Sequence, residues 1–327
     1  MSKRFAFLGK QSVVFEEFGL SRPQQHEVKV RTLASLMSTG TENIIFNRLF
    51  EKDSHWDRWI EYPFYPGYSV IGEIEELGPD VEGLKKGDRV AIRAGHASHH
   101  LVKDAGCTLI PDKMDPKVAA WFALAKIAFM GAKAAQYSLG SGVLIIGAGP
   151  IGQMSVRWAN AAGVYPILVA DTELMRLELA KNGGATHVMN QAITGDQSLV
   201  SAAMGGNLPS IVIDTTGNAQ VFSLALPLVA KFGRIVLLGD TGFPAQQHLS
   251  SDVILNGLTI VAAHDSHITS EWTEARVFKL FFDLCHTNRF SLDDLNTHVF
   301  KAAQCTEAYR IANEERGKSL GIVFDWT

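Results

Sequence analysis

Residues 147–152 carry the clearest chemistry in this sequence. They read Gly-Ala-Gly-Pro-Ile-Gly, a complete G-x-G-x-x-G pattern, and follow the apolar run 143–146, which predicts a buried strand. In such a pattern Gly147 permits a tight turn, Gly149 lets the backbone approach a pyrophosphate, and Gly152 lets the following helix pack closely on the strand. Apolar positions at helical spacing after the glycines predict that helix. The stretch therefore predicts a site for the pyrophosphate of a dinucleotide.

An acidic residue on the next strand indicates which dinucleotide binds. The N-terminus of the helix, at Pro150 and Ile151, would offer a positive dipole end, and the free N–H groups that follow Pro150, to the pyrophosphate. The apolar run 167–170 ends in Asp171, whose carboxylate can accept hydrogen bonds from both adenosine ribose hydroxyls and would repel a 2′-phosphate. Three glycines alone could form an ordinary turn, but strand, turn, helix, strand and acid occur here in the required order. We therefore expect NAD(H) as the cofactor, with NADP less favoured.

The composition excludes several other kinds of protein. The chain has 327 residues, which suits two domains, and 46% of them are apolar, enough to fill two cores. The formal net charge is −4 and no basic block occurs, so nucleic acid is not an expected partner. No run of about 18 apolar residues is found, so no membrane span is expected. Cys107, Cys285 and Cys305 are too scattered for a disulfide framework, and we expect reduced thiols in a cytoplasmic protein.

The pattern of strands and helices changes near residue 116. Before it, short strands such as 28–33 and 87–92 are punctuated by Gly, Pro and Asp, which is typical of a small barrel-like domain. After it, apolar strands alternate with helical patterns, which predicts an α/β fold with a doubly wound parallel sheet. The strands predicted for this sheet are 143–146, 167–170, 211–214, 234–238 and 258–263. We predict a catalytic domain of residues 1–120 and 266–327, with the tail 321–326 returning to it, and a Rossmann domain of residues 121–265.

Further motifs follow one another along the chain: 66–74, Gly87-Asp88-Arg89-Val90, the glycine-rich stretch, 213–217, 233–239 and 294–298. Their order resembles the medium-chain dehydrogenase/reductase superfamily from end to end. Within that superfamily, the short motifs 38–42, 66–68 and 324–326 are most similar to bacteriochlorophyllide a dehydrogenases and their relatives, a likeness that implies a branch and not a substrate.

The resemblance implies a fold, an active site and a partner. It implies a GroES-like catalytic domain, a Rossmann domain, and an active site in the cleft between them that takes a small-molecule substrate. Thr216 and Gly239, at the ends of two Rossmann strands, would lie near the nicotinamide ribose and ring. Many members dimerise by joining their Rossmann sheets edge to edge, so a homodimer is expected, with the strand near Leu258 to Ala263 at the seam.

This sequence departs from the superfamily where zinc-dependent members bind their metal. By resemblance, the three ligand positions fall at Thr39, at Tyr68 and near Leu124. Catalytic zinc needs about three Cys, His, Asp or Glu ligands, which Thr, Tyr and Leu do not supply. The four-cysteine lobe that binds structural zinc is also missing, since Cys107 is the only cysteine before Cys285. We therefore predict an enzyme with no bound metal.

A histidine cluster is the alternative metal site. His96, His99 and His100 lie close together after Gly95. In an extended strand, however, His99 and His100 would point to opposite faces and could not both face one ion.

Without zinc, the chemistry needs hydrogen-bond donors for the reacting oxygen. By resemblance, Thr41 occupies the Ser/Thr position of a proton relay, and Tyr68 lies in the cleft, where its phenol could donate a proton to an alkoxide. Lys126, two positions past the lost third ligand, could lower the pKa of Tyr68 by favouring phenolate. Each residue also has a structural alternative: Tyr68 as a packed aromatic, Lys126 as a solvated charge, and Thr41 as the N-cap of a helix over 41–49.

Two further segments could reach the substrate. His264 and Asp265 follow the last Rossmann strand and could contact nicotinamide or substrate, or be polar groups of the dimer seam. The aromatic residues of 46–65 could wall a large or planar substrate, or only pack their own loop.

The sequence predicts an oxidoreductase that transfers a hydride between NAD(H) and an alcohol or carbonyl substrate without catalytic zinc. One alternative is an NADPH-dependent quinone or enone reductase, which would also lack zinc. The other is a non-catalytic dinucleotide-binding protein.

Overall fold

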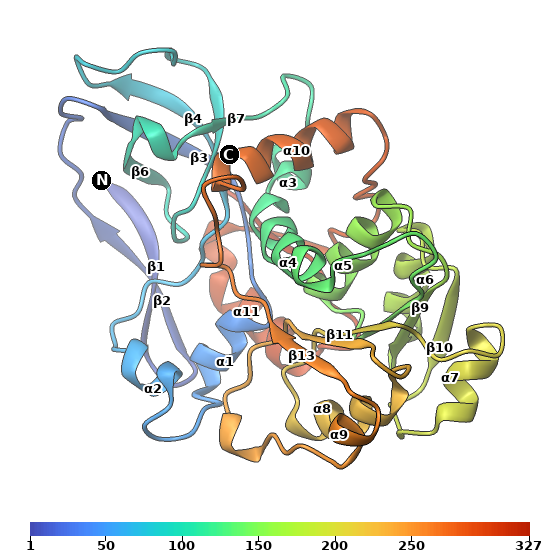
Figure 1. Ribbon diagram of the computed structural model, residues 1–327. Helices are drawn as coiled ribbons and strands as arrows, with labels where there is room; N and C mark the ends of the chain where they lie inside the picture. Colours follow the sequence, from blue (N-terminus) through green and yellow to red (C-terminus); the bar gives the residue numbers. More distant parts are fainter.

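Two large sheets divide the protein into two lobes, which lie side by side in Figure 1. The computed structural model describes residues 1–327. One lobe contains a six-stranded sheet in which every neighbouring pair is parallel, in the order β10-β9-β8-β11-β12-β13. Its strands are β8 (Val143–Ile146), β9 (Ile167–Asp171), β10 (His187–Asn190), β11 (Ile211–Asp214), β12 (Arg234–Leu237) and β13 (Thr259–Ala262). All four residues of β8 are buried, as expected for a central strand covered on both faces.

The other lobe contains the barrel-like sheets. Its main sheet has seven strands in the order β14-β15-β3-β4-β5-β7, with β6 also paired to β3. These strands are β3 (Glu27–Leu36), β4 (Val70–Leu77), β5 (Arg89–Ile92), β6 (His99–Lys103), β7 (Thr108–Leu109), β14 (His298–Lys301) and β15 (Ile322–Asp325). A separate antiparallel pair is formed by β1 (Ser2–Gly9) and β2 (Ser12–Phe18). The predicted fold class, a GroES-like β-rich domain with a Rossmann domain, is confirmed.

Helices cover the parallel sheet and close the barrel-like lobe. The Rossmann lobe carries α5 (Pro150–Ala161), α6 (Leu174–Asn182), α7 (Gln197–Ala203), α8 (Ala219–Ala225), α9 (Asp252–Leu255) and the short 3₁₀ turns η2 (Leu226–Leu228) and η3 (Pro244–Gln246). The other lobe carries α1 (Thr41–Asn47), α2 (His55–Trp59), α11 (Cys305–Glu314), η1 (Asp104–Gly106) and η4 (Ala302–Gln304). Between the lobes run α3 (Pro116–Ala119) and α4 (Phe122–Ala135), and α10 (Glu274–His286) packs on α4 (Figure 1).

The stretch Pro116–Ala135 has the length and apolar character of a membrane-crossing helix. This corrects the expectation that no segment of that kind occurs. About 72% of its apolar window is buried inside the protein. It packs against α5 and α10, so its apolar residues serve the core that joins the lobes.

Several predicted elements are found where the sequence placed them. The tail returns to the first lobe, because β15 pairs antiparallel with β3 through Val323 and Leu36. The edge position of the strand near residue 260 is also confirmed, since β13 ends the parallel sheet. Helix α8 begins at Ala219 and ends at Ala225. Pro227 lacks the N–H that an α-helix needs, and the chain changes to a 3₁₀ turn there.

The predicted division into residues 1–120, 121–265 and 266–327 remains a proposal. The two large sheets use chain segments that agree with it, but α10 packs against α4 across the second boundary.

Candidate active site

The glycine-rich turn is built around an open helix N-terminus. Gly147 has a φ of +90°, which a side chain would strain, and its N–H donates to the Ala170 carbonyl at 2.9 Å. A Cβ on Gly152 would lie 1.9 Å from the Gly147 oxygen, whereas a Cβ on Gly149 would meet nothing within 4 Å. Gly149 is the N-cap of α5, with no side chain capping the N–H groups and with Pro150 in the first turn. The turn therefore has both the space and the free donors that a pyrophosphate requires.

Asp171 lies beside this turn at the end of β9. Its Oδ2 accepts a hydrogen bond from the Ala148 N–H at 2.6 Å, and its Oδ1 accepts one from the Glu173 N–H at 2.8 Å. The carboxylate is only partly buried, so lone pairs remain for a ligand. Ile151 follows in the first turn of α5 and is also partly exposed. The residues present thus fit the pyrophosphate and adenosine ribose of a dinucleotide.

Thr216 and Gly239 lie at the same edge of the sheet. The N–H and the hydroxyl of Thr216 both donate to the Asp214 carboxylate, at 2.8 and 2.7 Å. Burial raises the pKa of that carboxyl, and the two Thr216 bonds oppose the rise. A Cβ on Gly239 would lie 2.3 Å from the Gly217 nitrogen, so only glycine lets the ends of β11 and β12 come this close. These residues line the carboxyl end of the parallel sheet, where ligands of such folds bind.

Tyr68 is partly buried just before β4. Its phenol donates to Ser38 Oγ at 2.5 Å, and the Arg93 guanidinium lies over its ring, 4.6 Å from the centroid. Burial raises the pKa of Tyr68 to about 12, against opposing effects of the Ser38 hydroxyl, the Arg93 cation and the Thr41 hydroxyl. The prediction that Lys126 lowers this pKa is wrong, because desolvation dominates and the neighbouring cation is Arg93.

Thr41 is the first residue of α1 and does not cap it. The N-cap is Gly40, and no side chain there makes a capping hydrogen bond. The alternative role as an N-cap is therefore wrong. The Thr41 hydroxyl instead lies close enough to Tyr68 to favour its ionised form. The structure thus brings Thr41 and Tyr68 together, as predicted by resemblance.

Lys126 is a buried ion-pair residue and not a solvated charge. Its side chain is 2% exposed, and Nζ donates to Asp265 Oδ1 at 2.7 Å and to Glu274 Oε1 at 2.9 Å. Arg93 Nη2 donates to the other carboxylate oxygen of Asp265 at 2.5 Å. Tyr68 and Lys126 therefore lie at the two ends of one network that passes through Arg93 and Asp265. The alternative of a surface lysine is wrong, because α10 and the loop after β13 cover this face of α4.

A second buried network holds Ser38 in place. Glu42 is 1% exposed and accepts hydrogen bonds from the Ser38 N–H at 2.7 Å and from the Tyr309 hydroxyl at 2.5 Å. His96 Nε2 lies 3.2 Å from Glu42, and His96 Nδ1 lies 2.8 Å from Ser35 Oγ. Burial, and then Glu42, raise the pKa of Tyr309 well above its usual value. Sequence reasoning missed this cluster, since its members lie up to 267 residues apart.

Comparison with known proteins shows the family. The model described as "Alcohol dehydrogenase GroES-like domain" matches residues 24–111, and the model described as "Zinc-binding dehydrogenase" matches residues 150–280. Together they match more than half of the chain. The chain belongs to the medium-chain dehydrogenase/reductase superfamily. It is an alcohol dehydrogenase-like oxidoreductase, and the resemblance on which the sequence interpretation rests is confirmed at this level.

Its relatives within the superfamily match almost end to end. L-threonine 3-dehydrogenase from Pyrococcus horikoshii is 26% identical over 94% of this chain and 93% of its own length, and that from Bacillus subtilis is 25% identical over 93% and 92%. Among solved structures, 2R,3R-butanediol dehydrogenase from Bacillus subtilis superposes with a TM-score of 0.84 at 17% identity, covering 99% of both chains. An alcohol dehydrogenase from E. coli complexed with NADH gives 0.83 at 20% identity, again over 99% of both chains.

The superfamily raises the question of zinc, and the residues present do not fit it. The three positions expected to hold the metal by resemblance are Thr39, Tyr68 and Leu124, none of which is a usual zinc ligand. Nowhere does the structure gather three or more His, Cys, Asp or Glu side chains in a way that could hold a metal ion.

The alternative histidine cluster is divided among separate partners. His96 contacts Glu42, while His99 Nε2 lies 3.5 Å from a different carboxylate, that of Glu75. His100 is buried with no partner at Nε2, and burial lowers its pKa to about 4.

The aromatic segment packs mainly into the core of the barrel-like lobe. Trp56 is buried, and its indole N–H donates to the Thr241 carbonyl at 3.2 Å. Tyr62 donates to the Ile45 carbonyl at 2.8 Å. Trp59 is 54% exposed and is the member of this group with most surface left for a ligand. The packing alternative is therefore confirmed for Trp56 and Tyr62.

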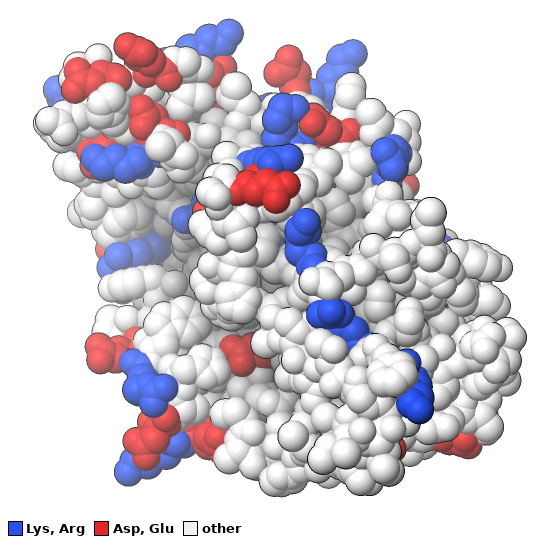
Figure 2. Space-filling model, viewed as in Figure 1, with Lys and Arg blue, Asp and Glu red and all other residues white.

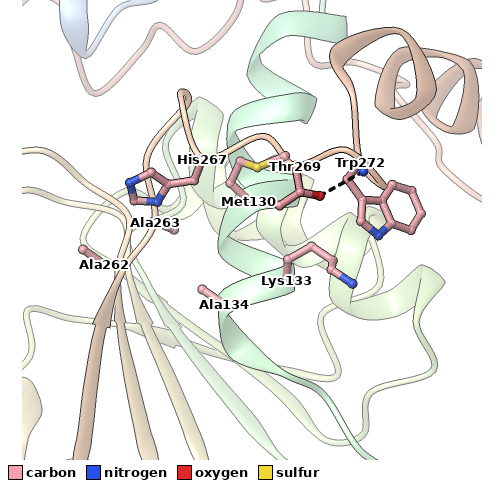
Figure 3. A pocket seen from close by; sticks show the side chains of 8 residues that line it. All are labelled: Met130, Lys133, Ala134, Ala262, Ala263, His267, Thr269 and Trp272. Atoms are coloured by element: carbon pink, nitrogen blue, oxygen red, sulfur yellow. Dashed lines mark hydrogen bonds between the residues drawn. The ribbon is translucent and has the colours of Figure 1, made fainter.

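One pocket lies outside this site. It has a volume of about 240 Å³ and opens between α4, the end of β13 and the loop that leads to α10 (Figure 3). None of the predicted catalytic or cofactor residues lines it. Its lining residues are Met130, Lys133, Ala134, Ala262, Ala263, His267, Thr269 and Trp272.

Proposed function

We propose that this protein interconverts an alcohol and a carbonyl compound with NAD(H) and without catalytic zinc. The observation that carries the proposal is the Tyr68 phenol, which Ser38 and Thr41 hold at the position where resemblance places a zinc ligand. Bound NAD(H) would supply or accept the hydride. The chain must then bind the cofactor, orient the substrate and move one proton.

The cofactor part of the proposal rests on the open turn at Gly149. The uncapped N-terminus of α5, with Gly147, Pro150, Ile151 and Gly152 around it, can bind the pyrophosphate through backbone N–H groups. Asp171, held by two backbone N–H groups, presents a negative charge where a 2′-phosphate would have to lie. Thr216 and Gly239 form the neighbouring sheet edge, where the nicotinamide end would bind. This arrangement supports NAD over NADP.

The proton would come from Tyr68. Because the pKa of Tyr68 is about 12, the phenol stays protonated at neutral pH and can donate to the oxygen of a carbonyl that is being reduced. Thr41 lies beside the phenol, and its hydroxyl can relay a proton back to the phenolate that this donation leaves. Lys126 acts at a distance, as a positioning residue: it fixes Asp265, and Asp265 fixes the Arg93 guanidinium over the Tyr68 ring.

Titration of the purified protein with NADH and NADPH, followed by fluorescence, tests the cofactor and metal proposals. Metal analysis of the same sample and a panel of alcohols and ketones complete the experiment. Tight NADH binding, weak NADPH binding, no stoichiometric zinc and turnover of a panel member support the proposal.

Other outcomes favour the alternatives. A preference for NADPH with turnover of enones or quinones would replace it with the reductase. Cofactor binding with no turnover on any panel would favour a dinucleotide-binding protein without catalytic activity. One tightly bound zinc per chain would refute zinc independence.

A cytoplasmic homodimer completes the proposal. The outer strand β13 leaves one edge of the parallel sheet open, and Ile254 and Leu255 beside it are 87% and 70% exposed. The face over α8, α9 and β13 shows few charged side chains (Figure 2). All three cysteines are free, as a reducing compartment would keep them. Sedimentation analysis of the wild type and of an Ile254→Lys variant tests the seam: the variant should be the monomer.

A further inference from the structure

Arg93 has a hydrogen-bond donor without an acceptor beside the proposed proton donor. It directly follows β5, and its guanidinium lies over the Tyr68 ring. Nη2 donates to Asp265, but Nη1 is shielded from solvent and makes no hydrogen bond. A charged N–H group that has lost water and found no acceptor is costly, so such groups mark positions where a ligand supplies the acceptor.

The surrounding charges leave this edge of Arg93 positive. Asp265 is the only carboxylate within ion-pair distance of Arg93, and its other oxygen is bound to Lys126. One carboxylate is therefore shared by two cations. Glu274 also pairs with Lys126, but its side chain is 40% exposed and more strongly screened by water. The unpaired edge of Arg93 is thus suited to an anionic oxygen.

We propose that Arg93 binds a carboxylate group of the substrate, so that the substrate is a hydroxy acid or the corresponding oxo acid. This inference rests on the proposed function, because it takes Tyr68 to face the reacting oxygen. Guanidinium is the side chain best suited to a carboxylate, since its donors lie in one plane and its charge is permanent. The Arg93 side chain as a whole is 22% exposed, so a substrate can approach the guanidinium from solvent. The carboxylate would then lie close to the phenol, which places the reacting carbon a short distance along the same molecule.

The test compares substrates and inhibitors that differ in the carboxylate alone. The substrate pair is 3-hydroxybutanoate and 2-butanol, assayed with NAD. The binding probe is butanoate, which lacks a hydroxyl and cannot react, titrated into the NADH complex by fluorescence. The variants are Arg93→Met and Arg93→Lys. The control is Arg31→Met, because Arg31 also pairs with carboxylates, Glu73 and Glu75, but lies on the barrel-like lobe away from Tyr68.

Arg93→Met should weaken butanoate binding and raise the KM for 3-hydroxybutanoate by about 10- to 100-fold, the loss expected for one hydrogen bond to a charged group. Any loss that comes from the contact of Arg93 with the Tyr68 ring should be equal for the two substrates, so the ratio of their kcat/KM values isolates the carboxylate. Arg93→Lys should keep part of the affinity. Arg31→Met should leave all of these values unchanged. Thermal unfolding of each variant shows whether it is folded, and Arg93→Lys remains the informative variant if Arg93→Met is not.

The outcomes separate this inference from the proposed function. If the wild type oxidises 2-butanol but neither binds butanoate nor prefers 3-hydroxybutanoate, the carboxylate site is refuted and the proposed function stands. If Arg93→Met binds butanoate as well as the wild type does, the site is likewise refuted. If the wild type binds butanoate through Arg93 but turns over no alcohol or ketone, the site is supported and the proposed function fails.

Discussion

Replacing Tyr68 by phenylalanine is the sharpest test of the proposed chemistry. The change removes one oxygen and leaves the ring, so the stacking of Arg93 over the ring at 4.6 Å is kept. What is lost is the phenolic proton and its hydrogen bond to Ser38 Oγ. If the phenol donates the proton, turnover must fall while the fold and the cofactor site remain intact.

The expected magnitudes follow from these contacts. A positioned general acid contributes about 10²- to 10⁴-fold to the rate, so kcat for ketone reduction should fall by that factor. Stability should change little, because the net contribution of one hydrogen bond is only about 1 kcal/mol and the desolvation of the phenol is removed at the same time. Because the pKa of Tyr68 is about 12, the wild-type reduction rate should show no decline near pH 10 from loss of its proton.

The assay is steady-state ketone reduction followed at the NADH absorbance, together with NADH titration and thermal unfolding. Tyr137→Phe is the matched control. The Tyr137 hydroxyl is also buried and makes no hydrogen bond, so the control removes the same oxygen at a site without chemistry. It should unfold at the same temperature as the wild type or higher, with unchanged kcat.

A Tyr68→Phe protein that binds NADH normally and keeps kcat within threefold of the wild type would refute the reasoning. Tyr68 would then be a packed aromatic residue, and Thr41 would be the next candidate for the proton donor. An equal loss of activity in Tyr137→Phe would show that the assay reports general damage to the fold.

Three other perturbations test separate parts of the structure. Asp171→Ser should weaken NADH binding about 10- to 100-fold and NADPH binding much less, because it removes both the ribose acceptor and the charge that repels a 2′-phosphate. Fluorescence titration measures both affinities, and equal losses for the two cofactors would contradict the assignment. Gly152→Ala should destabilise the fold by about 1–3 kcal/mol, measured by urea unfolding, because the new methyl would lie 1.9 Å from the Gly147 oxygen. Gly149→Ala should weaken NADH binding without loss of stability, because its new methyl would meet nothing within 4 Å in the protein. Burial keeps His100 neutral and lowers its pKa from 6.5 to about 4. The free energy of unfolding is therefore unaffected by His100 above pH 6.5 and falls by about 3 kcal/mol as the pH falls toward 4, because the unfolded chain takes up the proton first. His100→Phe should therefore lose less stability than the wild type between pH 7 and 4.5, and equal losses would show that other groups cause the acid sensitivity.

Local patterns were sufficient to predict the Rossmann lobe and the cofactor turn. The buried strands β8, β9, β11 and β12 are largely apolar, so they were visible as short apolar runs. The edge strand β13 was visible because residues 258–263 are apolar in all but Thr259. The edge strand β10 was missed, because its sequence, His-Val-Met-Asn, lacks a continuous apolar run. The glycine turn was predictable because each glycine meets a local steric requirement that no other residue satisfies.

Some residues of the proposed active site could be predicted from the sequence, and others could not. Thr41 and Tyr68 were found through a resemblance, and the structure places them together. Arg93 was missed, although a cation directly after the apolar residues of β5 was a signal that could have been noticed. Lys126 was found, but with the wrong role, since nothing near it in the sequence shows that α10 covers it.

The sequence by itself determined the elements whose causes lie within a few residues: the strand–turn–helix that would bind a pyrophosphate, the acid at the end of the next strand, and the absence of zinc ligands at the expected positions. Only the tertiary structure decided what surrounds Tyr68. Asp265 lies 172 residues from Arg93 and 139 from Lys126, and they meet because the lobes pack around α4. The pKa of Tyr68 depends on that packing, because desolvation and charge at contact distance are properties of the folded surroundings and leave no local pattern in the chain.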